Sequence, residues 1–147
     1  MTQKSLNEAQ ELLFFAYRAF TAAPDALLDE RGWNRVHHRL LHFIARDAGI
    51  SVNGLLDKLG VSKQAVHGPL KALVEAGLVQ TVPDEEDRRV KCLTLTGAGK
   101  QLEAALSGPQ YALLDEIFRQ SGAEAVAGWQ TVMRALAAAE WVVDPVL

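Results

Sequence analysis

Four polar side chains recur at helical spacing in the middle of the chain, within GVSKQAVHGPLKALVEAGLV, residues 60–79. Steps of one, three and four residues place them on one face of a helix. They are Lys63, Gln64, His67 and Lys71. Their amine, amide and imidazole groups can donate hydrogen bonds to phosphate oxygens and to base edges in a major groove. The spacing therefore predicts a helix that binds a polyanion.

Two short helices joined by a tight turn are expected to present this face. Ser51 can cap a helix over residues 52–59, Gly60 allows the turn, and Ser62 can cap the helix that carries the four donors. The buried stripe expected on that second helix is Val66, Leu70, Leu73 and Val74. Because the two helices share one apolar seam, the second must leave its opposite face to solvent.

The second of these helices carries Gly68-Pro69 in its middle. In a helix interior, glycine costs about 1 kcal/mol and proline about 3 kcal/mol relative to alanine. Proline also strikes the Cβ of the preceding residue, which Gly68 lacks. We expect a bend or a local widening, because Pro69 cannot donate to the carbonyl of Ala65. Close approach of the backbone to DNA and simple packing against the preceding helix are both open explanations.

Two short β-like runs, residues 78–82 and 90–95, follow Gly77 and predict a hairpin. The turn between them holds four acidic residues immediately before or beside two arginines. The acidic residues are Asp84, Glu85, Glu86 and Asp87. A solvated acidic loop would be repelled by DNA, so a plain surface ion pair between Asp87 and the arginines is an alternative reading.

Helices are also expected on both sides of this region. Ser5 and Glu8 have the spacing of a capping box that would begin the first helix, and Pro24-Asp25 would end it. A second helix is expected over residues 33–48. Thr96 can cap a helix over residues 97–106 that Gly108-Pro109 breaks. Further helices are expected over residues 111–119 and 123–141.

The terminal helices carry more apolar side chains than one small lobe can bury. These side chains are Phe14, Phe15, Tyr111, Leu113, Ile117, Trp129, Val132, Met133, Leu136 and Trp141. A two-fold dimer that pairs the terminal helices would bury them, whereas a monomer with a helical core would need more chain. The expected fold is mainly α with a small β-hairpin. Residues 5–30 and 105–147 would form dimerisation helices around a lobe of residues 31–104.

Composition fits one compact domain of 147 residues with 49% hydrophobic content. No run of eighteen apolar residues exists, so no membrane partner is expected. The single cysteine, Cys92, fits a reducing cytoplasm and is expected to be a buried structural thiol. The net charge of −3 conceals a basic centre, since residues 31–100 hold eleven Lys and Arg against seven Asp and Glu. This asymmetry indicates a polyanion partner.

Histidines and arginines gather on the helix over residues 33–48. His38 and His42 lie one turn apart, which is compatible with zinc, but no carboxylate or cysteine in helical register completes a ligand set. We therefore expect no metal and no cofactor. Instead, His38 and Arg39 would bridge the dimer core and the lobe, or His38 would line a ligand pocket. No nucleophile–base set and no glycine-rich phosphate loop appear either. An enzyme is the function class that the sequence favours least.

Residues 50–102 resemble the MarR family of winged helix-turn-helix transcriptional regulators. In DEEDRRVKCLTLTGAG, Asp87-Arg88-Arg89 and the stretch from Leu93 to Thr96 have the family's D-R-R…L-T spacing, and LVEAGLV before it is also typical. Upstream, RVHHRLLHFIARDAGISVNGLL is similar to the helix that leads into the DNA-binding lobe in one branch of the family. The resemblance thus covers nearly the whole chain.

The resemblance implies a homodimeric, cytoplasmic, sequence-specific regulator, namely a repressor of pseudo-palindromic operators in double-stranded DNA whose affinity a small phenolic or anionic effector modulates. Arg89 would enter the minor groove, with Asp87 holding its guanidinium. The DNA-binding set would be Ser62, Lys63, Gln64, His67, Lys71, Asp87, Arg88 and Arg89. The effector-lining set would be Trp33, His37, His38 and Arg39. The alternative is a winged-helix protein-interaction module without specific DNA binding.

Overall fold

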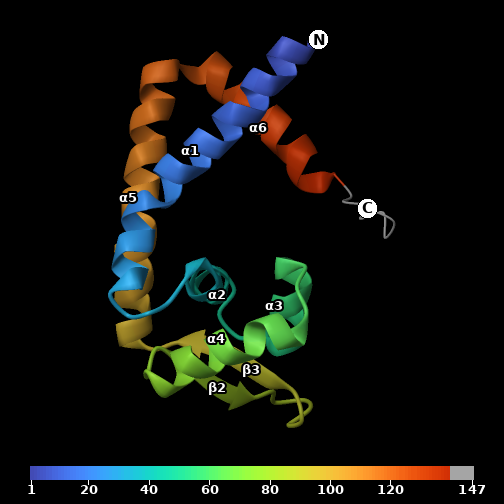
Figure 1. The fold of residues 1–147 in the computed structure, drawn as a ribbon. Coiled ribbons are helices and arrows are strands. Elements are labelled where there is room, and N and C mark those ends of the chain that lie inside the picture. The colour runs from blue at the N-terminus through green and yellow to red at the C-terminus, as the bar shows by residue number, and fades with distance from the viewer. Residues whose placement is uncertain (140–147) are drawn as a thin grey trace. The chain divides into compact units, whose positions relative to one another are not determined.

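The computed structural model describes residues 1–139, which are mainly helical with one small antiparallel sheet (Figure 1). The elements are α1 (Gln3–Asp29), α2 (Arg35–Arg46), β1 (Ile50–Ser51), α3 (Val52–Leu59), α4 (Lys63–Glu75), β2 (Val79–Pro83), β3 (Lys91–Leu95), α5 (Gly97–Ser121) and α6 (Ala123–Ala138). The predicted fold class is confirmed. The chain forms two compact units, one of residues 1–110 and one that starts at Tyr111. Within residues 1–139, no helix is long and apolar enough to cross a bilayer.

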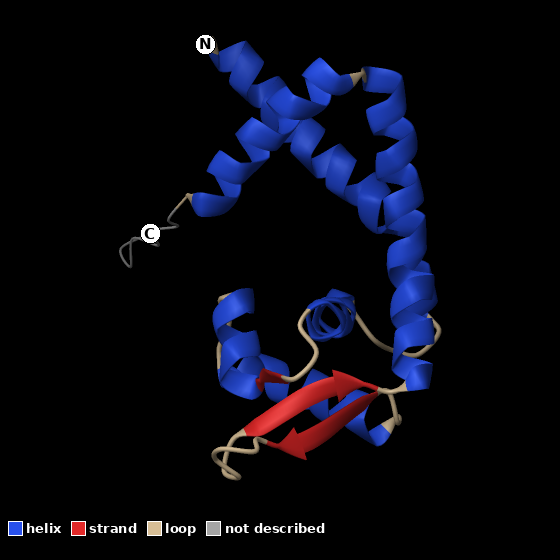
Figure 2. Ribbon diagram, turned by 180° about the vertical axis from the view of Figure 1, so that it is seen from behind, coloured by secondary structure: helices blue, strands red, loops and turns tan. Residues whose placement is uncertain are grey.

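The sheet has the strand order β1-β3-β2 and is antiparallel throughout (Figure 2). β2 and β3 form the predicted hairpin, in a register that runs from Val79 opposite Leu95 to Pro83 opposite Lys91. The sequence pattern did not predict β1, which adds Ile50 opposite Leu93. Two residues are too few to show the alternation that marks a strand.

The core of the first unit lies between the sheet and helices α2, α3 and α4. Seven hydrophobic side chains of this core are completely buried, namely Leu40, Leu41, Ile44, Leu55, Leu73, Leu93 and, from α5, Leu106. Full burial of a leucine or isoleucine side chain stabilises the folded chain by about 1.5–3 kcal/mol. This shared core fixes α3 and α4 against the hairpin, and so determines which face of α4 points outward.

The helix-turn-helix forms as its capping residues predict. Ser51 Oγ accepts a hydrogen bond from the Gly54 N–H at 3.0 Å, and Ser62 Oγ accepts one from the Ala65 N–H at 3.3 Å. Between them, Gly60 has a φ of +63°, a left-handed conformation that glycine adopts without steric cost. α4 then continues as α-helix through Gly68-Pro69 to Glu75.

The predicted beginning and end of the first helix were both wrong. Thr2, not Ser5, caps α1, since Thr2 Oγ1 accepts the Ser5 N–H at 3.1 Å. Pro24 lies inside α1 and does not end it. Proline removes the donor for the carbonyl four residues back, but here Gln110 Nε2 donates to that carbonyl, of Phe20, at 3.1 Å.

A break at Gly108-Pro109 was also predicted and is wrong, because α5 runs unbroken from Gly97 to Ser121. Leu102 and Leu106 on this helix are buried in the core, which stabilises it against the loss of one hydrogen bond. Thr96 does cap it, as predicted: its Oγ1 accepts from the Gly99 N–H at 3.0 Å. The last predicted helix ends at Ala138, and Trp141 lies outside the described residues.

Helix α2 is shorter than the predicted 33–48. Asn34 caps it, because the Asn34 side chain accepts the Val36 N–H at 2.9 Å. The helix is amphipathic, with His37, His38 and three aliphatic residues buried. It therefore forms the centre of the first unit, and its buried histidines need polar partners.

Candidate nucleic-acid interface

The four predicted donors lie exposed together on α4. The opposite side of the helix is fixed in the core by Val66 and Leu73, which are 2% and 0% exposed. The exposed donors are Lys63, Gln64, His67 and Lys71. The ammonium group of Lys71 lies 3.8 Å from Glu75 Oε1, an exposed pair that water screens. All four side chains therefore remain available to an anionic partner.

Ser62 lies at the N-terminal end of the same helix. Its side chain is exposed, and its hydroxyl caps α4 as described above. The N–H groups of a helix's first turn carry partial positive charge, which favours a phosphate at this end. The residue thus has a clear structural role in addition to the DNA contact predicted for it.

The turn of the hairpin holds Arg89 in a fixed orientation. Its Nε donates to Asp87 Oδ1 at 3.1 Å, and its Nη2 donates to Asp87 Oδ2 at 3.2 Å. These bonds, together with one from the Arg89 backbone N–H, lower the pKa of Asp87 below its usual value. The Arg89 side chain is nevertheless 91% exposed, and Arg88 is exposed beside it. The expected pairing of Asp87 with Arg89 is therefore present.

The acidic residues of the turn divide into two kinds. Asp84 and Asp87 are half-buried and shape the loop, since Asp84 Oδ2 accepts the Asp87 N–H at 3.2 Å. Glu85 and Glu86 are exposed. Of the four carboxylates, that of Asp87 is paired with a cation, Arg89, which offsets its charge, whereas Asp84 has a structural role in the loop.

Cys92 lies on β3, next to this turn. It is half-buried rather than buried as predicted, with its Sγ 4.0 Å from Asp84 Oδ1. β3 is the middle strand of the sheet, so its alternating side chains point into the core or toward solvent. Cys92 alternates with the buried Leu93, which explains its partial exposure.

Two of the predicted effector residues form a stacked pair at the start of α2. The rings of Trp33 and His37 are 5.0 Å apart and parallel within 3°. His37 Nδ1 accepts the Asn34 N–H at 3.1 Å, and burial lowers the pKa of His37. His37 therefore closes the capping box of α2 and supports the indole.

His38 and Arg39 instead connect α2 to other helices of the first unit. His38 Nε2 lies 3.0 Å from Ser107 Oγ on α5, and Ser107 in turn donates to Glu103. Burial is the main cause that lowers the pKa of His38. Arg39 Nη2 donates to the Tyr17 hydroxyl of α1 at 2.8 Å. Within residues 1–139, no three His, Cys, Asp or Glu side chains gather as metal ligands.

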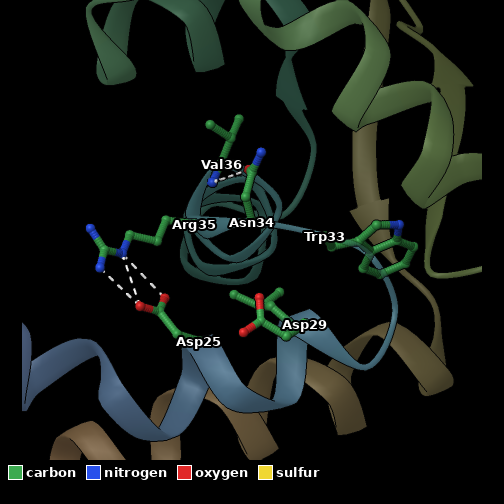
Figure 3. Close-up of a pocket in the computed structure, with 7 residues that line it drawn as sticks. Asp25, Asp29, Trp33, Asn34, Arg35 and Val36 are labelled. Atoms are coloured by element: carbon green, nitrogen blue, oxygen red, sulfur yellow. Dashed lines mark hydrogen bonds and ion pairs between the residues drawn. The ribbon is translucent and has the colours of Figure 1, made fainter.

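A pocket of about 360 Å³ opens between the end of α1 and the start of α2 (Figure 3). Its lining is Asp25, Leu28, Asp29, Trp33, Asn34, Arg35 and Val36. Arg35 forms an ion pair with Asp25 there, in which Arg35 Nη2 lies 2.9 Å from Asp25 Oδ2. Of the four predicted effector residues, Trp33 lines this pocket. Sequence reasoning missed Asp25 and Arg35, because nothing in their spacing reveals a pair across a turn.

A helix-turn-helix followed by a hairpin wing defines a winged-helix DNA-binding lobe. A family model described as MarR family matches residues 31–90. Over 136 residues the chain is 40% identical to the HTH-type transcriptional regulator PetP of Rhodobacter capsulatus, a match that covers 92% of this chain and 82% of PetP. The chain therefore belongs to the MarR family of DNA-binding transcriptional regulators, which are not enzymes.

Two further proteins are similar to this chain. The transcriptional activatory protein BadR of Rhodopseudomonas palustris is 37% identical over 62 residues, which are 42% of this chain and 35% of BadR. The crystal structure of CouR from Rhodococcus jostii RHA1, bound to p-coumaroyl-CoA, matches with a TM-score of 0.75 at 21% identity and covers 97% of this chain and 100% of that chain. The likeness to CouR shows the fold alone.

Proposed function

We propose that the protein is a homodimeric repressor that binds pseudo-palindromic operators and releases them when a small ligand binds. The exposed face of α4 carries this proposal, because four donors stand there with no role in the core. The eight predicted DNA-binding residues would then divide between the two grooves. Ser62 and the α4 donors would contact the major groove, and Arg88 and Arg89 the DNA beside the wing, where Arg89 would enter the minor groove while Asp87 holds its guanidinium.

Exposed apolar side chains on α1 support a dimer. Leu12, Phe14 and Phe15 are 60%, 64% and 52% exposed in the single chain. The second unit, taken by itself, exposes Trp129, Val132 and Leu136. Large apolar side chains that stay exposed in such numbers favour an interaction site. Residues 5–30 and 105–147 would supply the interface, of which residues 140–147 lie outside the described part.

The pocket between α1 and α2 is the proposed effector site. Trp33 offers an aromatic wall, and Arg35 offers a guanidinium that an anionic group could share with Asp25. His37 would hold the indole in place, whereas His38 and Arg39 would act through the contacts that tie α2 to α5 and α1. CouR, which shares the fold, was crystallised with an aromatic anionic ligand, p-coumaroyl-CoA.

Footprinting and affinity measurements on the DNA upstream of the protein's own gene test the proposal. Phosphate contacts make log affinity fall linearly with log salt, so protection of a two-fold symmetric site and a steep salt slope are expected. A protein-interaction module without DNA specificity would protect no site at any salt concentration. Sedimentation of the purified protein tests the dimer independently.

Replacing Arg89 by Ala should weaken operator binding about tenfold while leaving the melting temperature unchanged, because the side chain is exposed and packs against nothing in the core. Arg119→Ala is the matched control. Arg119 is also exposed and paired with carboxylates, Asp115 and Glu116, but lies outside the lobe. Equal effects of the two substitutions would reject the role of Arg89 in the wing.

A further inference from the structure

Gly68 is a glycine for which the fold of the chain gives no reason. Gly60 and Gly77 have positive φ, and a Cβ on Gly99 would overlap the carbonyl oxygen of Leu78, whereas Gly97, Gly108 and Gly128 have neither constraint. Gly68 has no positive φ, is exposed, and a Cβ added to it would meet no other atom within 4 Å. Alanine would be the better helix former at this position.

The neighbouring proline does not require glycine either. In α1, Ala23 precedes Pro24 within an uninterrupted helix. The chain thus accommodates a Cβ directly before an interior proline. The backbone, the packing and the proline thus place no requirement for glycine at position 68, and we relate this glycine to what α4 contacts outside the chain.

Gly68 lies among the four donors of the exposed α4 face. It follows Gln64 by four residues and precedes Lys71 by three, so the three residues share one side of the helix. Long polar side chains thus flank a position with no side chain at all. The row of exposed side chains is therefore interrupted at Gly68, where the helix backbone can approach a partner closely.

The backbone at this gap offers a hydrogen-bond acceptor. Pro69 has no N–H, so the carbonyl of Ala65 lacks the helical donor normally found four residues ahead. In a helix interior the proline ring also crowds the carbonyl four residues back, which here is that of Ala65. Ala65 is itself exposed, beside Gly68 on the same face.

We propose that α4 reads DNA partly through its main chain, a proposal that rests on the DNA-binding function proposed above. The missing side chain of Gly68 lets the helix approach the base edges closely. The Ala65 carbonyl then accepts a hydrogen bond from an exocyclic amino group, of adenine or cytosine, which are the base-edge donors of the major groove. Gly68 and Pro69 are thereby specificity-determining residues.

Gly68→Ala tests the close approach. The variant should melt at the same temperature as the wild type or higher, because the new methyl group has free space in the chain. Its operator affinity should fall at least about tenfold, since a contact that defines one base pair is held apart. Gly97→Ala is the control: Gly97 is also exposed, has no positive φ and has room for a Cβ, but it lies at the start of α5 and outside the segments proposed for the dimer interface. That variant should bind like the wild type.

Pro69→Ala tests the acceptor, because it restores the N–H that occupies the Ala65 carbonyl. Affinities are measured for the operator and for every single base-pair change in it. At one base pair in each half-site, the wild type should bind the operator base pair more tightly than its replacements. The Pro69→Ala variant should bind all of them with equal affinity. If the wild type binds none of the duplexes, the proposed function itself is wrong. If the wild type binds its operator, three results would overturn this inference alone. They are a Gly68→Ala variant of equal affinity, a Gly68→Ala variant that fails to fold, and a Pro69→Ala variant of unchanged base preference.

Discussion

The proline inside α1 makes one glutamine side chain unusually important for stability. Pro24 cannot donate to the carbonyl of Phe20, and Gln110 supplies the missing hydrogen bond from α5, 90 residues away. Gln110 is 9% exposed, so water cannot easily replace it. Gln110→Leu keeps the volume and removes the donor. The substitution should leave a carbonyl without a partner in a partly buried position.

The expected cost follows from the surroundings of that carbonyl. An unsatisfied buried acceptor costs about 1–3 kcal/mol, and because Phe20 is half-buried we expect about 1–2 kcal/mol. In a Pro24→Ala background, residue 24 regains an N–H that can close the ordinary helical bond to Phe20. Gln110→Leu should then cost less than about 0.5 kcal/mol, which gives an interaction energy of about 1 kcal/mol in the double-mutant cycle.

Urea unfolding of the four proteins measures this cycle. One fixed subunit concentration is needed, because association of subunits would make the apparent stability depend on concentration. Gln101→Leu, an exposed glutamine on the same helix, is the control and should change the free energy of unfolding by less than about 0.5 kcal/mol. An equal cost of Gln110→Leu in both backgrounds would refute the reasoning.

Three further substitutions test other features by their effect on unfolding. Gly99→Ala should cost about 3 kcal/mol or prevent folding in urea titrations, because its methyl group would overlap the Leu78 carbonyl; a wild-type midpoint would contradict this. Ser51→Ala removes the α3 cap and should cost about 1 kcal/mol in the same titration. Burial lowers the pKa of His38, so on acidification below about pH 6.5 the unfolded chain takes up a proton before the folded one and stability falls. His38→Gln should therefore lose less stability between about pH 7.5 and pH 5.5, by up to about 1.4 kcal/mol per pH unit, and an unchanged pH dependence would exclude His38 as the cause.

Features that depend on neighbouring residues in the chain could be predicted from the sequence. Ser51 and Ser62 cap the helices expected of them, and Gly60 makes the expected turn, because capping and turns are decided within four residues. Locality did not suffice at α1, where Ser5 was predicted and Thr2, three residues earlier, is the cap. The hairpin was predicted for the same reason, since β2 and β3 are joined by a short turn. The exposed face of α4 follows from the periodicity of its buried face.

Features that depend on distant residues could not be predicted. Pro24 looks like a helix end until Gln110 satisfies the carbonyl that it frees, and no local pattern reveals that partner. The pair of Asp25 and Arg35 in the pocket belongs to the same class. The exposed donors of α4 and the pairing of Arg89 with Asp87 agree with the expected site, while their contacts with DNA stay a prediction for the experiments above.

One hydroxyl group joins the end of one helix to the beginning of another. Thr96 Oγ1 donates to the Gly77 carbonyl at 2.6 Å, just beyond α4, and accepts from the Gly99 N–H in the first turn of α5. The end of α4 and the beginning of α5 are thus linked by hydrogen bonds to a single oxygen atom. A movement of the first turn of α5 would therefore have to break one of these two hydrogen bonds or carry Gly77 along with it.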